Sequence, residues 1–483
     1  MLTGDRRTGL NRRDFVRAGT AAGLAAMLPG CAKRNPTVAV VGAGLAGLVA
    51  TWELRKAGLT VRTFEAADRA GGRAWTLRGH FDNDRFVDAG AMGSDRSYTR
   101  WVGYCDQFGI ELETPSSPRR DSQMYLDGRL LSGSALRDDP ALWPLPLTDA
   151  EKAKAPSRLL FSELQPIAAE IGAVDNVLDP AWADYDDLSL LEFLRQRGLS
   201  DAAIALVERS LNYNSLATVS TLSALRDTAR RLQGPPAPVT PVAGHGALPE
   251  AMAAQLNDTI IYNTSLTAVS TLEDGVRLTF ASGDTQTTYD ADYVVLTLPF
   301  TALRKVAFEP GLPAERQSMI NRLPYTRIAK TFVQARRRFW ESGNDFSVLT
   351  SDTAFERVFN LSSAEAGEPG LLLNWINGTG LDTFTELDED EHAALVTEWL
   401  ESLWPDAADG FEKPITINWA KRFSEGAYAH YAPGQLRSFA VALPQPIGRL
   451  HFAGEHTELV APGIEGAVTS GARAANEILN RLA

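Results

Sequence analysis

Three glycines near the start of the chain form the kind of turn that binds a dinucleotide. Gly42, Gly44 and Gly47 follow residues 37–41 (TVAVV), a short, apolar and β-branched run that predicts a buried parallel strand. Gly42 allows a tight turn, Gly44 lets backbone N–H groups reach a pyrophosphate, and Gly47 lets a helix pack closely on a strand. This spacing therefore predicts a site where backbone groups bind linked phosphates.

The elements after the glycines support the same interpretation. Residues 48–57 predict an amphipathic helix, and the unpaired N–H groups before it, at Leu45 and Ala46, favour phosphate oxygens. Residues 59–64 predict the next strand, and Glu65 at its end can accept hydrogen bonds from ribose hydroxyls. The unit predicts dinucleotide binding, but by itself it does not distinguish FAD from NAD.

Two further segments decide between these cofactors. Residues 68–73 read DRAGGR, and residues 88–92 read DAGAM. They resemble the GGR segment and the next flavin-contacting turn of the flavin-containing amine oxidase family, which includes monoamine, polyamine and L-amino acid oxidases. Arginine suits this role because its planar fork pairs with pyrophosphate oxygens. The resemblance implies that the cofactor-binding residues here are Arg69, Gly72, Arg73, Gly90, Ala91 and Met92.

The end of the chain carries a matching pair of motifs. Residues 451–457 (HFAGEHT) resemble the family's FAGE-type segment, and residues 462–467 (PGIEGA) open a predicted helix. The resemblance implies that Glu455 binds the ribityl chain, and that Ile464 places a helix N-terminus against the flavin pyrimidine ring, where its dipole favours negative charge. Because motifs at both ends of the chain fit one cofactor, we expect FAD. The remaining implied contacts are Gly454, Gly463 and, at the adenine end, Leu266.

The fold class that follows is α/β, with a discontinuous Rossmann-like FAD-binding domain and a second, mixed α+β substrate-binding domain. A chain of 483 residues exceeds the roughly 250–300 residues of a single core, so two domains are expected. We assign residues 36–100, 235–305 and 425–483 to the FAD-binding domain. Residues 101–234, mostly helical in pattern, and 306–424 form the substrate-binding domain.

The resemblance also implies two catalytic residues. Residues 298–305 (LPFTALRK) resemble the segment that carries the family's active-site lysine, which assigns that role to Lys305. Its positive charge could assist oxygen reduction, and the alternative is a surface lysine. Trp419 and Tyr428 resemble the family's aromatic residues on a strand in front of the flavin, with Tyr428 orienting the substrate amine.

Three positions depart from the family's pattern. Ala427 stands where some members attach FAD through a Cys, so we predict noncovalent FAD. Gly463 stands where monoamine oxidases carry the second tyrosine of their aromatic cage. Gly93 stands where L-amino acid oxidases often carry an Arg for the substrate carboxylate, and Arg96 nearby could replace it.

The reaction implied by the resemblance is the oxidation of a C–N bond. An amine becomes an imine, which hydrolyses to an aldehyde and ammonia or a smaller amine, while O2 is reduced to hydrogen peroxide. The alternative is an L-amino acid oxidase that yields a 2-oxo acid, ammonia and hydrogen peroxide. A C–C desaturating flavoprotein and a non-catalytic exported flavoprotein stay open as other classes, because a fold does not fix a function.

Composition excludes other functions. The net charge of −13 argues against nucleic-acid binding, which needs a basic surface. The two cysteines, Cys31 and Cys105, and the six histidines lack metal-ligand spacing, so we expect no metal site.

The first residues resemble a targeting signal. Residues 11–17 (NRRDFVR) resemble a twin-arginine motif, and residues 18–28 are too short for a membrane span but fit a signal h-region. Residues 28–31 (LPGC) resemble a lipoprotein box, so Cys31 is a possible lipid anchor. We expect residues 1–31 to direct export to the periplasm or to a membrane-anchored lipoprotein, with a disordered basic tail as the alternative.

Overall fold

The computed structural model describes residues 35–115, 120–341, 345–362, 369–404, 407, 409–461 and 463–483. The chain forms two units, residues 1–36 and 37–483, and every element of the fold belongs to the second. The predicted signal, residues 1–31, lies outside the described residues. In the described part of the chain, no helix combines the length and apolar character needed to cross a bilayer.

A parallel sheet of five strands supports the glycine turn, in the order β20–β13–β1–β2–β9. The strands span Leu450–Phe452, Tyr293–Leu296, Thr37–Val41, Thr60–Phe64 and Ile260–Ile261. The strand predicted at residues 37–41 is confirmed as β1, in the middle of the sheet, with Val38 and Val40 completely buried. Its central position places Gly42 at the carboxyl edge of the sheet, where such folds bind ligands.

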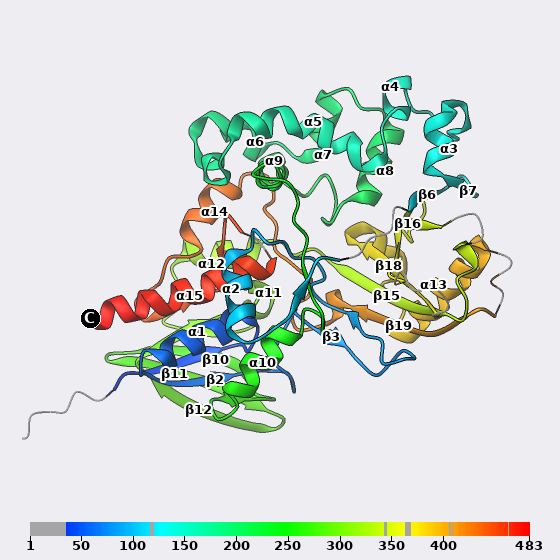
Figure 1. The fold of residues 1–483 in the computed structure, drawn as a ribbon. Helices are drawn as coiled ribbons and strands as arrows, with labels where there is room; N and C mark the ends of the chain where they lie inside the picture. Colours follow the sequence, from blue (N-terminus) through cyan, green and yellow to red (C-terminus); the bar gives the residue numbers. More distant parts are fainter. Residues whose placement is uncertain are drawn as a thin grey trace, which may run out of the picture. The chain divides into compact units, whose positions relative to one another are not determined.

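Helices from both ends of the chain pack together on this sheet. Helix α1 (Leu45–Lys56) begins inside the glycine motif, earlier than predicted, because Gly44 is its N-cap. Helix α15 (Gly463–Leu482) lies beside α1, as Figure 1 shows, and its Ala475 and Ile478 share an apolar core with β1. The start and the end of the sequence therefore stabilise one sheet.

A smaller sheet of four strands, β12–β11–β10–β14, packs against the first. Its strands span Thr285–Ala291, Gly275–Ser282, Ser265–Leu272 and Ala307–Glu309. Residues 260–297 alternate in polarity, with turn residues at 273–275 and 282–284, which predicts antiparallel strands. Tight turns join β10 to β11 and β11 to β12, and both pairs are antiparallel. The rings of Phe64 on β2 and Phe280 on β11 stack with centroids 4.1 Å apart, which joins the two sheets.

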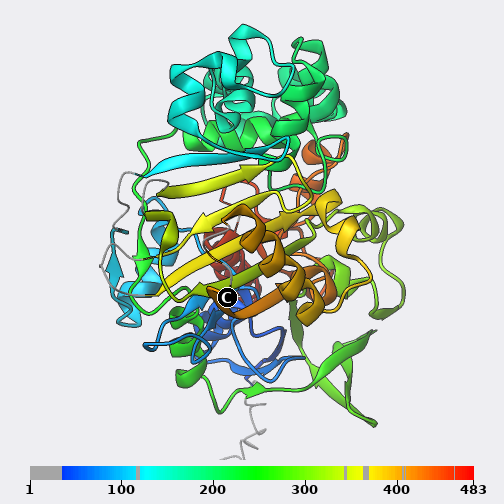
Figure 2. The ribbon, with the colours of Figure 1, turned by 90° about the vertical axis from the view of Figure 1, so that its right-hand side faces the viewer.

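The third sheet has seven strands in the order β19–β15–β18–β17–β16–β6–β7, and Figure 2 shows it with α13 (Glu389–Leu403) in front. The strands span Phe411–Asn418, Ile328–Ala335, Gly370–Asn377, Arg357–Asn360, Phe346–Ser351, Asp121–Leu126 and Arg129–Ser132. Every residue of β15 is buried, including Lys330, so this strand carries a charged group into the interior.

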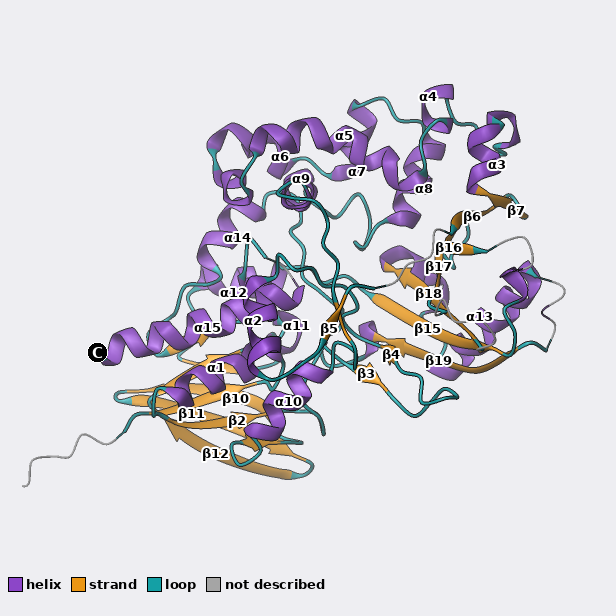
Figure 3. Cartoon of the chain, viewed as in Figure 1, coloured by secondary structure: helices purple, strands orange, loops and turns teal. Residues whose placement is uncertain are grey.

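A helical layer fills most of the segment 133–231, and Figure 3 shows its helices gathered on one side of the chain. Its helices are α3 (Gly133–Asp138), α4 (Asp149–Lys152), α5 (Pro156–Ile171), α6 (Ala183–Asp187), α7 (Leu190–Gln196), α8 (Asp201–Ser210) and α9 (Thr221–Arg231). Helix α9 packs against α5, α6 and α7 and is buried over most of its length. The remaining helices are α2 (Thr99–Gln107), α10 (Ala247–Gln255), α11 (Phe300–Leu303), α12 (Ala314–Arg322) and α14 (Leu436–Ala442).

The contact between α1 and α15 depends on a glycine. A Cβ added to Gly471 would lie 2.2 Å from the carbonyl oxygen of Ala46. We expect Gly471→Ala to lower the free energy of unfolding by about 1–3 kcal/mol, because two helix backbones must separate. Gly103→Ala in α2 is the matched control, since its Cβ would meet nothing within 4 Å. That change should be stabilising by about 0.5–1 kcal/mol. Equal urea midpoints for both variants would contradict the expectation.

Candidate active site and cofactor groove

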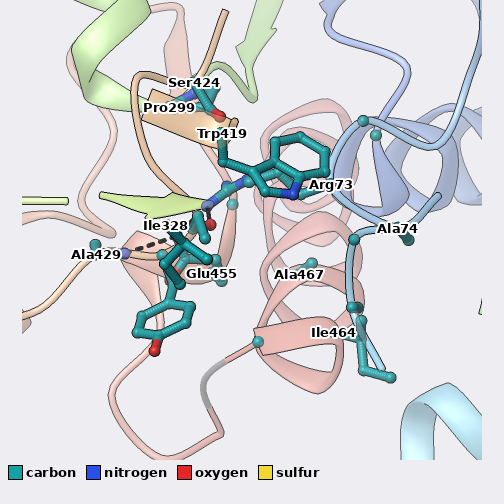
Figure 4. Close-up of a pocket in the computed structure, with 18 of the residues that line it drawn as sticks. Arg73, Ala74, Pro299, Ile328, Trp419, Ser424, Ala429, Glu455, Ile464 and Ala467 are labelled. Carbon is teal, nitrogen blue, oxygen red and sulfur yellow. Dashed lines mark hydrogen bonds and ion pairs between the residues drawn. The ribbon is translucent and has the colours of Figure 1, made fainter. Parts of the chain in front are cut away.

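Nearly all residues that the sequence predicts for the site line one cavity of about 1880 Å³. Its lining includes both predicted catalytic residues, Lys305 and Tyr428, and every predicted cofactor-binding residue except Gly47. Figure 4 shows Arg73, Trp419, Glu455 and Ile464 around this cavity. The fold thus brings distant segments together, while the role of each residue stays a prediction.

The glycine turn is tight on the protein side and open on the cavity side. Gly42 has φ +104°, and a Cβ on Gly47 would lie 1.8 Å from the carbonyl oxygen of Gly42. A Cβ on Gly44, by contrast, would meet nothing within 4 Å. No side chain caps the start of α1, so the N–H groups there are available to an anion at Leu45 and Ala46. The turn therefore fits the pyrophosphate of a dinucleotide.

Glu65 ends β2 at the edge of the cavity. Its two carboxylate oxygens accept hydrogen bonds from the backbone N–H groups of Ala43, at 2.6 Å, and Ala67, at 2.9 Å. Burial raises the pKa of Glu65, and these backbone donors oppose the rise. The carboxylate holds the glycine turn in place, and its remaining lone pairs can accept ribose hydroxyls.

The GGR segment connects the turn to the far end of the chain. Arg69 donates to the carbonyl of Gly72 at 2.9 Å, and burial lowers the pKa of its guanidinium group. Arg73 donates from Nη1 to Glu455 Oε1 at 2.7 Å and to the carbonyl of Ala427 at 2.5 Å. Arg73 is therefore committed to protein contacts that position Glu455, in addition to the pyrophosphate role that the sequence implies.

Backbone contacts form the next wall. A Cβ on Gly90 would lie 2.0 Å from the carbonyl oxygen of Arg73, and the N–H of Ala91 donates to that carbonyl at 2.9 Å. Met92 packs against the apolar cluster that contains Trp419. The indole N–H of Trp419 donates to the carbonyl of Ala89 at 2.9 Å, which fixes the ring beside the cavity.

The C-terminal segment and β10 complete the groove. Gly454 has φ +125°, and its N–H donates to Ser470 Oγ at 2.9 Å. Gly463 begins α15 with φ +73°, and Ile464 follows it, largely buried. Leu266 on β10 is buried and lines the same cavity. Pro462, predicted to open the helix, lies outside the described residues.

The cavity has two lysines of different character. The side chain of Lys305 is 68% exposed and forms an ion pair with Glu425. Lys330, on β15, is only 2% exposed, and sequence reasoning missed it. Its Nζ donates to the carbonyl oxygens of Asp88, at 3.2 Å, and Gly90, at 2.5 Å. The available signal was a single charged residue in residues 329–335 (AKTFVQA), a run whose pattern predicts a strand.

The surroundings of Lys330 set its charge. Burial lowers its pKa to about 7, while Asp88 opposes the fall. The Nζ also lies 4.5 Å from the centre of the Trp375 ring, which favours the charged form. His245 donates its backbone N–H to Asp88 Oδ1, at 2.9 Å, and its ring nitrogen Nδ1 lies 2.7 Å from Asp88 Oδ2. These contacts fix the turn at residues 88–90, whose carbonyl oxygens accept the hydrogen bonds from Lys330.

Tyr428 is held rigidly, although it lies in a loop and not on the strand that the sequence predicts. Its hydroxyl donates to the carbonyl of Asn212 at 2.7 Å, and its own carbonyl accepts the N–H of Thr326 at 2.9 Å. Burial raises the pKa of the phenol, so it stays protonated. Arg96, the predicted substitute for a carboxylate-binding arginine, is exposed and does not line the cavity.

Among the described residues, no group of three His, Cys, Asp or Glu side chains is placed so that it could bind a metal ion. Cys105 is a free, buried thiol, and burial raises its pKa to about 12, as expected for a group that serves packing.

Comparison with known proteins gives a consistent result. The sequence model of the family described as "Flavin containing amine oxidoreductase" matches residues 45–479. A putative L-amino-acid oxidase of Bacillus subtilis is 27% identical over 460 residues, which cover 92% of this chain and 95% of that protein. An L-amino-acid oxidase of Demansia vestigiata is 26% identical over 456 residues, with 92% and 87% covered. A solved structure of wild-type putrescine oxidase bound to putrescine superimposes with a TM-score of 0.76 at 23% identity, covering 92% of this chain and 99% of that one.

These findings confirm the predicted fold class, a Rossmann-like FAD-binding domain joined to a mixed α+β domain. They also confirm FAD as the cofactor, which the open face at Gly44 and the uncapped start of α1 fit. The protein is an enzyme that oxidises amines. With nearly its whole length matched, the chain belongs to the family of flavin-containing amine oxidoreductases.

Proposed function

We propose that this enzyme oxidises the C–N bond of an amine or amino acid bound between Tyr428 and Lys330, with O2 as the electron acceptor. For a primary amine the balance is RCH2NH2 + O2 + H2O giving RCHO, NH3 and H2O2. The observation that carries the proposal is one cavity that contains the cofactor groove, a buried lysine and an anchored tyrosine. FAD, which we propose is bound noncovalently because Ala427 replaces a linking Cys, supplies the two-electron chemistry.

The protein's own contribution is orientation and exclusion of water. The bond from Tyr428 to the carbonyl of Asn212 prevents rotation of the phenol, so the ring face can hold an amine in one pose. Trp375 and Trp419 line the same cavity with apolar rings. Lys330, fixed by two carbonyls, places a proton or a positive charge at one defined point.

Lys330 is our preferred candidate for the active-site lysine. A reacting site excludes water. Lys330 is buried in the cavity wall, whereas the Lys305 side chain is 68% exposed and pairs with Glu425. A charge in a dry site acts far more strongly than one in water, so Lys330 is better placed to stabilise developing negative charge on oxygen.

L-amino acid oxidation is the second candidate. Two curated relatives carry that name, and their matches extend over 92% of this chain. Arginine side chains also line the cavity, which suits a substrate with a carboxylate.

The reaction itself is tested by anaerobic mixing of the yellow holoenzyme with a panel of amines and amino acids. We expect at least one compound to bleach the flavin absorbance, and hydrogen peroxide to form when air is admitted. Denaturation should release all flavin into solution. A holoenzyme that no amine bleaches would refute the proposed reaction and leave a non-catalytic flavoprotein.

The two lysines can be separated by Lys330→Met and Lys305→Met. We expect Lys330→Met to slow reoxidation of the reduced enzyme by O2 about 100-fold, because a preorganised charge is lost. Lys305→Met should change this rate less than about twofold, because an exposed charge is screened. Stopped-flow absorbance measures both rates.

The pH dependence gives a second readout. Lys330 is charged below its pKa of about 7, so the wild-type reoxidation rate should fall as the pH rises through 7. Lys330→Met should lack this step. If the step survives in Lys330→Met but disappears in Lys305→Met, the original assignment to Lys305 is correct.

We also propose that residues 1–31 direct export by the twin-arginine route and that Cys31 receives a lipid, leaving the enzyme periplasmic or membrane-anchored. The support is the NRRDFVR motif followed by LPGC in the sequence. Replacing Arg12 and Arg13 by Lys should retain the protein in the cytoplasmic fraction, measured by cell fractionation. Export that is unchanged by this substitution would disprove the route, and Cys31→Ser tests the anchor.

A further inference from the structure

We infer that α9 forms an anion-binding subsite in the cavity, which binds an acid group of the substrate at a distance from the amine that is oxidised. The group that binds is a carboxylate. It would be recognised by Arg226, Arg230 and Arg231, all of which line the cavity. The inference rests on the proposed function for the identity of the reacting amine. It concerns the substrate's charge, which that function leaves open.

Helix α9 lines the end of the cavity that contains Tyr428, which we call the substrate end. Tyr428 donates its hydroxyl to the carbonyl of Asn212, and the hydroxyl of the next residue, Tyr213, donates to Asp227 Oδ2 at 2.7 Å. The guanidinium group of Arg226 lies 5.4 Å from the ring centre of Tyr431. These contacts bind α9 to the loop that carries Tyr428, so the charges of the helix face the reacting amine's side of the cavity.

The charges on this face do not balance. Asp227 is the only acidic residue that α9 contributes to the described lining. Arg226 donates to Asp227 Oδ1 from Nε, at 3.2 Å, and from Nη2, at 2.9 Å. Burial alone would raise the pKa of Asp227, but Arg226 and Arg230 outweigh it and hold the pKa at about 2. Helix α9 therefore contributes one carboxylate and three guanidinium groups to the lining, so its lining residues carry a positive excess.

Arg230 is the residue best able to bind a ligand. Its Nη2 lies 4.0 Å from Asp227 Oδ1, which is too long for a hydrogen bond, and its side chain is 28% exposed. Its Nη1 is buried without an acceptor within the described residues. A buried N–H without an acceptor costs free energy. Rotation of the Arg230 side chain would let this group donate to a carboxylate in the cavity, and no hydrogen bond within the protein would be lost.

A second ammonium group on the substrate would find no unpaired carboxylate among the described residues at this end of the cavity. Besides Asp227, the lining contains Glu425, three residues before Tyr428 in the sequence, and Glu455. Glu425 pairs with Lys305, and Glu455 pairs with Arg73 at 2.7 Å. The second ammonium group of a diamine would therefore lie near the arginines of α9 with no unpaired carboxylate to balance it. The carboxylate of an acidic substrate would instead neutralise the excess positive charge of these arginines.

The other cations of the substrate end are already engaged. Arg327 donates to the carbonyl of Gly378 and to Asp382 Oδ1, at 2.8 and 2.7 Å. Lys421 donates to the carbonyls of Thr385 and Leu387. The subsite is thus assigned to α9 and not to the cavity as a whole.

The first test measures binding without catalysis, using the FAD-loaded enzyme and glutarate, a dicarboxylate that has no amine to oxidise. Glutarate should perturb the visible flavin spectrum and give a saturable Kd. Arg230→Met should raise this Kd about tenfold or more, as expected for loss of a charged hydrogen bond. Arg230→Lys should retain part of the affinity. Arg195→Met on α7, exposed and outside the lining, is the matched control and should leave the Kd unchanged.

Arg231→Met keeps the test valid if Arg230→Met misfolds, because Arg231 is exposed at the end of α9 and its replacement should not disturb the fold. It should weaken glutarate severalfold with an unchanged melting temperature. If glutarate fails to bind the wild type, or if Arg230→Met and Arg195→Met bind it equally, the subsite does not exist.

The second test compares amines of matched length: pentylamine, 5-aminopentanoate, norvaline and glutamate. The wild type should show a higher kcat/KM for 5-aminopentanoate and glutamate than for pentylamine and norvaline, and Arg230→Met should remove the difference. If the kcat/KM for norvaline equals that for glutamate, only an α-carboxylate is recognised, and the distal subsite is overturned. If no amine reduces the flavin but glutarate binding depends on Arg230, the proposed reaction fails and the subsite stands.

Discussion

The site depends on one partly buried ion pair, between Arg73 and Glu455. The two side chains are 22% and 7% exposed, and their atoms Nη1 and Oε1 lie 2.7 Å apart. Arg73 also donates to the carbonyl of Ala427, and Glu455 accepts the N–H of Ala429. Charges withdrawn from water are tolerated only when they are paired, so either residue alone would be unstable here. The pair therefore forces three segments, distant in sequence, to meet at one point beside the cofactor groove.

Around this pair, backbones approach one another more closely than any side chain would allow. Gly47 packs against Gly42, Gly90 against Arg73, and Gly471 against Ala46, each with no space for a Cβ. Such contacts fix the positions of the N–H groups and carbonyls that surround a cofactor, because neither backbone can move independently. The seven-stranded sheet and the helical layer then add side chains, among them Lys330 and Tyr428, to a groove whose geometry is already set.

Residue patterns alone predict the local parts of this site, whereas the grouping of distant segments around one cavity was predicted from the resemblance of their motifs to a known family. The strand at 37–41, the glycine turn and the hairpins from β10 to β12 follow from short-range periodicity and turn residues, and all are observed. Lys330 could not be found this way, because its acceptors are the backbone carbonyls of Asp88 and Gly90, which leave no trace in side-chain types. Helix α9 is a similar case. Its charged residues suggest a solvated surface, and only tertiary packing shows that Arg226 is buried.

The charges of the cavity impose opposite demands on the two halves of an oxidase reaction. Most amines are protonated near neutral pH, and a protonated Lys330 repels such an ammonium group, so it opposes binding of the substrate before the amine has lost its proton. Oxygen reduction, in contrast, benefits from a positive charge at the same point. Because the pKa of Lys330 is about 7, its neutral and charged forms are similar in free energy near neutral pH. The neutral form can serve amine binding, and the charged form can serve oxygen reduction. The net charge of the protein is −13, yet the lining of the cavity includes Lys330 and the three arginines of α9. A substrate that brings its own carboxylate relieves this repulsion, so the charge of Lys330 need not be given up when the amine binds.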